Sequence, residues 1–320
     1  MPIYPSDYNP PFLFRNGHVA TIYSGLLRQV GGLAYIRKRL ELADGDFLDL
    51  DWSYAENPDD KVVILLHGLE GDAKRPYMAG GARLLNAHGY DACSVNLRGC
   101  SGQPNRLFRS YHSGATEDLD AVMAHILALG TYLKIYIIGF SLGGNLCLKY
   151  LGEGRTVPKE LKAAVAVSVP CDLHSSLKAL MSFRNRLYAR RFRKHLLAKL
   201  RIKQRIYPNC ITDAEIKRIR TLKDFDDIYT SRAHGFSDAL DYYRKCSCRQ
   251  FLSEIHIPTL LINAKNDSFL GPECYPIPEA EAHPLLFLEM PDYGGHVGFF
   301  DIKNCHYTEK RTIKFLEGVP

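Results

Sequence analysis

The sequence predicts an α/β protein: a mostly parallel sheet flanked by helices, interrupted by a helical insertion. Apolar runs that are typical of buried strands alternate with helical patterns over residues 61–168. This alternation builds βαβ units, whose crossovers are right-handed and whose strands run parallel. A charged, helical stretch at about 172–250 then intervenes before the strand pattern resumes at Ile257.

The individual elements follow from the same periodicities. Residues 1–30 are expected to form an arm with a short helix near Gly17–Leu27. Ala34–Leu42 and Phe47–Trp52 are expected to form a hairpin that turns through Asp44-Gly45-Asp46. Strands are predicted at 61–66, 91–96, 134–138, 162–168, 258–264 and 285–290, and helices near 75–88, 116–129, 142–152 and 306–317.

The segment Gly139-Phe140-Ser141-Leu142-Gly143 matches the G-x-S-x-G nucleophile elbow. It follows a predicted buried strand and precedes a predicted helix, which is the context that this motif needs. The two glycines suit a strained turn in which neighbouring backbones approach the serine closely. The simpler interpretation is a tight turn whose serine only caps a helix. The downstream residues favour a nucleophile, Ser141.

A serine hydroxyl is a weak nucleophile at neutral pH, so it needs a base and an acid that orients the base. In enzymes with this elbow the acid and then the histidine follow the serine along the chain. Asp267 lies just after the predicted strand 258–264, and His296 lies in the loop after strand 285–290. Both positions are past strand ends, where open α/β sheets bind ligands. Asp267 is therefore the predicted acid and His296 the predicted base.

Other residues compete for these roles. His256 precedes a strand, His283 enters one, and His306 starts the last helix, so none has the placement of His296. Asp238 and Asp292 are the alternative acids, although Asp292 follows a proline and suits a turn.

Ester chemistry at a serine also needs two backbone N–H groups that point at one oxyanion. The residue after the nucleophile, Leu142, is expected to supply one. The other is expected from the loop His67-Gly68-Leu69-Glu70-Gly71, which follows strand 61–66, and we assign it to Leu69. The simpler interpretation is an ordinary turn that ends the strand.

Several motifs together resemble one branch of a known family. They are residues 11–18, 67–71, 96–102, 111–114, 139–143 and 294–299. In combination they resemble the YheT/embryogenesis-associated branch of the α/β-hydrolases, over nearly the whole chain and least in residues 175–230. The resemblance implies an α/β-hydrolase fold and a serine hydrolase that acts on esters or acyl lipids, sometimes by acyl transfer. It implies a triad of Ser141, Asp267 and His296.

Composition agrees with one domain over residues 1–320 that carries a cap at about 172–250. The chain has 320 residues and is 46% hydrophobic, enough for a sizeable core. Nine cysteines without paired C-x-x-C spacing favour free thiols and a cytoplasmic location. No signal peptide or membrane-spanning run is predicted. His112 invites a metal assignment, but partner ligands at suitable spacing are missing from the sequence, so neither a metal nor a cofactor is expected.

Positive charge concentrates in residues 184–205, which hold ten Lys or Arg and no acidic residue. Its apolar residues recur every three or four positions. They are Leu187, Tyr188, Phe192, Leu196, Leu197 and Leu200. The favoured interpretation is a cap helix with its apolar face on an acyl pocket, and the alternative is peripheral contact with an anionic membrane. Nucleic-acid binding is not expected, because no recognition motif accompanies the charge.

These observations predict a serine hydrolase that cleaves carboxylic esters, with a small-molecule ester or a lipid as its substrate. Two alternatives remain open. One is an acyltransferase that uses the same triad, and the other is a non-catalytic membrane-surface protein that relies on residues 184–205.

Overall fold

The computed structural model describes residues 3–301 and 304–319, and a nine-stranded sheet forms its centre. The strand order is β1-β9-β8-β7-β6-β4-β5-β3-β2. The strands are β1 (Ile3–Tyr4), β2 (Ile36–Glu41), β3 (Phe47–Ser53), β4 (Lys61–Leu66), β5 (Asp91–Asn96), β6 (Lys134–Phe140), β7 (Leu161–Val167), β8 (Thr259–Ile262) and β9 (Leu286–Glu289). Only β2 and β3 pair antiparallel with their neighbours, so the predicted mostly parallel sheet is confirmed.

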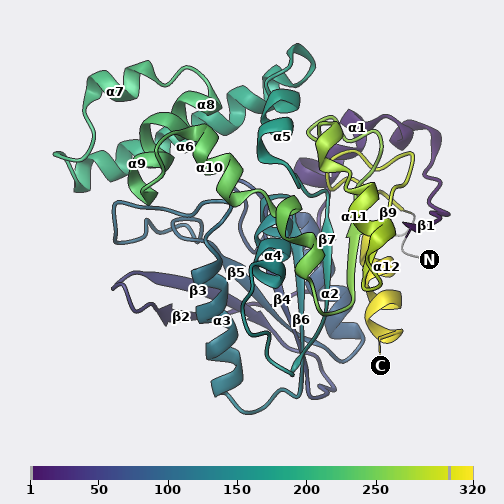
Figure 1. Ribbon diagram of the computed structural model, residues 1–320. Coiled ribbons are helices and arrows are strands. Elements are labelled where there is room, and N and C mark those ends of the chain that lie inside the picture. The colour runs from purple at the N-terminus through teal and green to yellow at the C-terminus, as the bar shows by residue number, and fades with distance from the viewer. Residues whose placement is uncertain (1–2, 302–303, 320) are drawn as a thin grey trace.

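Helices cover both faces of the sheet (Figure 1). Outside the stretch between β7 and β8 they are α1 (Gly17–Ile22), α2 (Pro76–Ala87), α3 (Thr116–Ala128), α4 (Leu142–Gly152), α11 (Ile277–Ala282) and α12 (Tyr307–Glu317), with short turns η1 (Phe12–Arg15), η2 (Tyr23–Leu27) and η6 (Pro272–Cys274). Side chains alternate across β4: Val62, Ile64 and Leu66 join the core under α3 and α4. Val63 and Leu65 join the core under α2 and α12. This two-sided burial explains why the strand reads as a continuous apolar run.

The predicted elements agree with the observed ones to within a few residues, and the hairpin forms as β2 and β3. Two elements were missed. The two-residue strand β1 pairs with β9 at the sheet edge, and α11 fills the connection between β8 and β9. Both are short, so neither has room for a recognisable period.

The predicted insertion, residues 172–250, lies above the sheet in Figure 1, and we call it the cap segment. It contains α5 (Leu173–Leu180), η3 (Phe183–Asn185), α6 (Arg186–Ile206), α7 (Asp213–Arg218), α8 (Leu222–Phe225), η4 (Asp226–Thr230), α9 (Ser231–His234), α10 (Ala239–Cys246) and the start of η5 (Cys248–Glu254). Apolar side chains of α5 to α8 form a separate cluster that includes Leu180, Leu200, Ile216 and Phe225. Within the described ranges, no helix is long and apolar enough to cross a membrane.

The apolar face of α6 packs into this cluster, with one exception. Leu196 and Leu200 are buried there, and Tyr188, Phe192 and Leu197 are partly buried against it. Leu187 was predicted on the same face but is 71% exposed. Leu187 and Leu196 are nine positions apart, about two and a half turns at roughly 3.6 residues per turn, so they point in opposite directions.

A buried ion-pair network fixes the loop that follows β5. The Arg98 guanidinium makes two hydrogen bonds to Asp118, of 2.8 and 2.6 Å. It also donates to Asp44 at 2.7 Å and to Asp46 at 3.1 Å, and its side chain is almost completely buried. The loop after β5 is thereby tied to the hairpin and to α3.

We expect Arg98→Ala to lower the free energy of unfolding by about 3–5 kcal/mol, because it leaves buried carboxylates without their counter-charge. Chemical denaturation measures the effect. Arg106→Ala, which removes a solvent-exposed pair with Glu41, is the matched control and should leave the unfolding transition unchanged. Equal effects of the two substitutions would contradict the conclusion that the buried ion pairs of Arg98 stabilise the fold.

Candidate active site

Three backbone segments meet at Ser141, and glycines make their approach possible. Ser141 follows β6 and has φ 53° and ψ −118°, a conformation that costs energy for a residue with a side chain. A Cβ on Gly139 would lie 2.3 Å from the Gly143 carbonyl oxygen, and one on Gly143 would lie 2.5 Å from the Leu66 oxygen. A Cβ on Gly68 would lie 3.0 Å from the Ser141 Cβ. The turn therefore requires glycine at 139 and 143 and leaves little room for a side chain at 68.

The structure brings Ser141, His296 and Asp267 into one hydrogen-bonded row. His296 Nε2 lies 2.9 Å from Ser141 Oγ, and His296 Nδ1 lies 2.8 Å from Asp267 Oδ2. The second Asp267 oxygen accepts from the Phe269 amide at 2.9 Å, and the carboxylate is buried. The His296 ring stacks on Phe269 with centroids 4.4 Å apart. With one nitrogen donating to Asp267, the other is free to accept the serine proton.

The competing residues lie elsewhere. Asp292 pairs with Lys265 at the surface, and Asp238 caps α10 through the Asp241 amide. His283 accepts from the amides at the start of β9, and His306 is the N-terminal cap of α12. His256 is exposed before β8.

The N-terminal arm holds the histidine loop in place. The His296 amide donates to Thr21 Oγ1 at 2.8 Å, and Ser24 Oγ donates to the Gly298 oxygen. Gly295 has φ 56°, and a Cβ there would lie 2.2 Å from the Gly17 oxygen. This role of Thr21 could not be predicted from the sequence, because a hydroxyl in a short helix carries no motif.

The backbone amide of Leu142 directly follows Ser141 in the chain, and that of Leu69 follows Gly68, where a Cβ would lie 3.0 Å from the Ser141 Cβ. Among the described residues, neither amide has a hydrogen-bond acceptor. The amides on each side of Leu69 are occupied: Gly68 N–H donates to the Tyr77 hydroxyl at 3.2 Å, and Glu70 N–H to the Tyr111 hydroxyl at 2.9 Å. Burial raises the pKa of Tyr77 to about 12, so that hydroxyl stays neutral. Two tyrosines thus hold the loop with the Leu69 amide unoccupied.

His67, which begins this loop, has a structural role. Its Nε2 accepts from the Leu97 amide at 3.1 Å, and its Nδ1 lies 2.8 Å from the Gly68 oxygen. Burial lowers its pKa to about 4, so the ring is neutral and bridges the loops after β4 and β5.

A cavity of about 560 Å³ opens between the sheet edge and the cap segment, with Ser141 and His296 in its wall. Apolar side chains make up much of the lining, including Leu69, Leu177, Leu180, Phe192, Phe225 and Phe269. The arm contributes Ile22 and Leu26. The cavity therefore has the size and the apolar lining that suit a small organic ligand.

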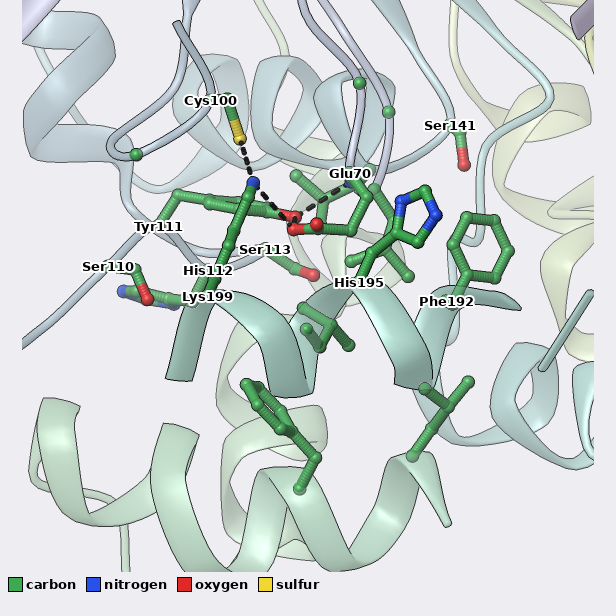
Figure 2. A pocket seen from close by; sticks show the side chains of 18 of the residues that line it. Glu70, Cys100, Ser110, Tyr111, His112, Ser113, Ser141, Phe192, His195 and Lys199 are labelled. Atoms are coloured by element: carbon green, nitrogen blue, oxygen red, sulfur yellow. Dashed lines mark hydrogen bonds and ion pairs between the residues drawn. The ribbon is translucent and has the colours of Figure 1, made fainter. Parts of the chain in front are cut away.

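A polar cluster joins α6 to the loop after β4 (Figure 2). Lys199 Nζ lies 2.9 Å from Glu70 Oε1 and 3.2 Å from Cys100 Sγ, and the Tyr111 hydroxyl donates to the same Glu70 oxygen at 2.8 Å. Burial opposes the charge of Lys199, but Cys100 and Glu70 outweigh it and raise its pKa. In Figure 2, His195 of the same helix lies on the side of this cluster toward Ser141, and Phe192 lies farther from the cluster than His195. Burial lowers the pKa of His195, and the positive charge of Arg191 adds to this effect.

Among the described residues, no group of three or more His, Cys, Asp or Glu side chains is placed to hold a metal ion. His112 instead packs against His234, with ring centroids 4.2 Å apart, and the pKa of His112 is lowered, chiefly by burial.

This fold, with a serine at the turn after β6, is that of an α/β hydrolase. The family model described as the alpha/beta hydrolase fold matches residues 61–301, and the chain belongs to that family. Within it, the chain is 37% identical to the esterase candidate YheT of Escherichia coli, over 92% of this chain and 87% of that protein. The predicted relationship to the YheT branch is thereby confirmed.

More distant relatives carry lipase names. Mouse phospholipase ABHD3 is 27% identical over 99% of this chain and 80% of its own length. Human monoacylglycerol lipase ABHD2 is 28% identical over 94% of this chain and 76% of its own length. The structure of esterase Pf2001 from Pyrococcus furiosus superposes with a TM-score of 0.61 and 20% identity, covering 91% of this chain and 96% of that chain. That likeness supports the fold.

Glycine substitutions test the close approach at the turn. We expect Gly143→Ala to lower the free energy of unfolding by about 1–3 kcal/mol, because the new methyl group meets fixed backbone. Gly81→Ala in α2 is the control: its Cβ would have no neighbour closer than 4.0 Å, and we expect a gain of about 0.4–1 kcal/mol. Thermal or chemical unfolding of the two variants measures both. A Gly143→Ala protein as stable as the wild type would refute the steric argument.

Proposed function

We propose that this protein is a serine hydrolase that cleaves carboxylic esters through an acyl-enzyme. The observation that carries the proposal is the row Ser141–His296–Asp267, with hydrogen-bond distances of 2.9 and 2.8 Å. The esterase and lipase names of the relatives support ester hydrolysis. In this proposal residues 1–320 form one hydrolase domain, and the cap segment closes the cavity over its active site.

In the first half of the reaction, His296 Nε2 removes the proton of Ser141 Oγ as that oxygen bonds to the ester carbonyl carbon. The carbonyl π electrons move to oxygen and create an oxyanion. The imidazolium then gives its proton to the alkoxide leaving group as the carbon–oxygen ester bond breaks, and an alcohol departs. Asp267 keeps the ring in the required tautomer and stabilises its positive charge.

In the second half, water replaces the alcohol. His296 takes a proton from the water as its oxygen bonds to the acyl carbon, and the proton returns to Ser141 Oγ as the acyl–serine bond breaks. The unoccupied amides of Leu69 and Leu142 are proposed to donate to the oxyanion in both halves. Loss of one such donor typically costs about 2.7–4 kcal/mol of transition-state stabilisation. These steps use no metal and no organic cofactor.

The cavity suggests the class of acyl group. Its apolar lining and its volume of about 560 Å³ suit an aliphatic or aromatic acyl chain, with the ester carbonyl at Ser141. A small ester or a lipid acyl ester is therefore the proposed substrate. The cytoplasmic location expected from the nine cysteines stays a prediction.

The nucleophile is tested with a fluorophosphonate probe and p-nitrophenyl esters of graded chain length. We expect the wild-type protein to be labelled at Ser141 and to hydrolyse the esters, and we expect Ser141→Ala to lose both properties. Ser168→Ala is a control for the loss of a hydroxyl near the site. Labelling that persists in Ser141→Ala would exclude Ser141 as the nucleophile.

The acid is tested by a substitution that keeps its shape. We expect Asp267→Asn to lower kcat about 10⁴-fold, because an amide favours the wrong tautomer of His296. Asp292→Asn, which changes only a surface pair with Lys265, should retain wild-type kcat. Steady-state kinetics on one p-nitrophenyl ester compares the two variants. If they were equally active, Asp267 would not be the acid.

A further inference from the structure

Large apolar side chains project into solvent from two segments beside the cavity. In the N-terminal arm, Phe12 is 87% exposed and Leu27 is 64% exposed. In η3 and the first turn of α6, Phe183 is 76% exposed and Leu187 is 71% exposed. Single exposed apolar residues are ordinary, but several of them in two segments that meet are typical of an interaction surface.

Unpaired cations lie within the second segment. Arg184, Arg190 and Lys194 are exposed, and none makes a hydrogen bond or ion pair with any residue that the structure describes. Other cations of this stretch are engaged: Lys199 with Glu70 and Arg201 with Asp213. The sequence 184–205 contains no acidic residue that could neutralise the free ones. Apolar tips and free positive charges therefore occur together.

The two segments meet at the cavity. His18 of the arm stacks on Tyr188 of α6 with ring centroids 5.8 Å apart, and their polar atoms lie 3.2 Å apart. Ile22 and Leu26 of the arm line the cavity together with Arg191 of α6. In Figure 1, α1, α5 and α6 all lie in the upper part of the molecule, above the sheet. We call the exposed residues Phe12, Leu27, Phe183, Arg184, Leu187, Arg190 and Lys194 the mouth surface.

We propose that the mouth surface docks on an anionic lipid bilayer, so that the cavity receives its ester directly from the membrane. The proposal rests on the proposed function, because it names the setting in which the same site meets its substrate. Peripheral membrane binding has two contributions: apolar side chains that enter the lipid interface, and cations that are attracted to anionic headgroups. A nucleic acid would use the cations but would leave Phe183 and Leu187 exposed to water.

This mode differs from a helix that lies flat in the interface. Leu196 and Leu200, the centre of the apolar face of α6, are buried in the cap segment and are not free to enter lipid. The exposed side chains of η3, of the first turns of α6 and of the arm remain free to make contact.

Vesicle sedimentation tests the proposal. The probe is a set of vesicles of phosphatidylcholine alone or with about a third phosphatidylglycerol. We expect the wild-type protein to bind the anionic vesicles, and we expect salt to weaken this binding strongly. R184E/R190E/K194E should weaken it by on the order of 100-fold or more, at about 1 kcal/mol per lost cation. F183S/L187S should weaken it about 10-fold or more.

A matched control reverses the same number of charges at the opposite edge of the sheet. K134E/K159E/K162E alters residues at the amino ends of β6 and β7 and should bind vesicles nearly as the wild type does. Hydrolysis of soluble p-nitrophenyl butyrate is measured in every variant. It reports whether the protein is folded and has the proposed activity, independently of vesicle binding. All of these variants should retain it, because none of the altered side chains lines the cavity.

The outcomes separate the two proposals. A wild-type protein that hydrolyses the soluble ester but binds no vesicles, or binds neutral ones equally well, overturns the docking proposal alone. Vesicle binding that falls equally in K134E/K159E/K162E and in R184E/R190E/K194E also overturns it. So does a protein that binds RNA but binds no vesicles. Vesicle binding without any ester hydrolysis would instead refute the proposed function.

Discussion

The close packing of three backbone segments around Ser141 is the constraint on which the rest of the site depends. Strand β6, helix α4 and the loop after β4 approach so closely that Gly139 and Gly143 have no room for a side chain, and a Cβ on Gly68 would crowd Ser141. In the proposed mechanism, this approach lets the backbone amides of Leu69 and Leu142 act on the substrate without any contribution from their side chains. Backbone groups around Ser141 thus supply part of the candidate site, and the loop that carries His296 supplies the rest.

Much of the site was predictable from sequence because it follows the order of the parallel strands. Ser141, Asp267 and His296 each follow a strand that reads clearly as buried, and parallel strands deliver their ends to one edge. The supporting contacts were not predictable. Thr21, Tyr77 and Tyr111 are ordinary residues in sequence, and only the tertiary structure shows that their hydroxyls hold the two loops.

The elements of the fold also differ in how well the sequence predicts them. Long, strongly periodic elements were predicted nearly to the residue, whereas β1 and α11 were missed because they are too short to display a period. Leu187 was assigned to the wrong face because spacings of three and four were counted without following the helix around its axis. Leu187 instead belongs to the mouth surface.

The ion pair between Lys199 and Glu70 links α6 of the cap segment to the loop that carries Leu69. Glu70 follows Leu69 directly, has φ 55°, and is held by Tyr111 as well as by Lys199. Any movement that carries α6 away to admit a bulky molecule must break this ion pair and release one restraint on the neighbouring amide. In the proposed mechanism, the loop would regain this restraint only when α6 had returned to its place.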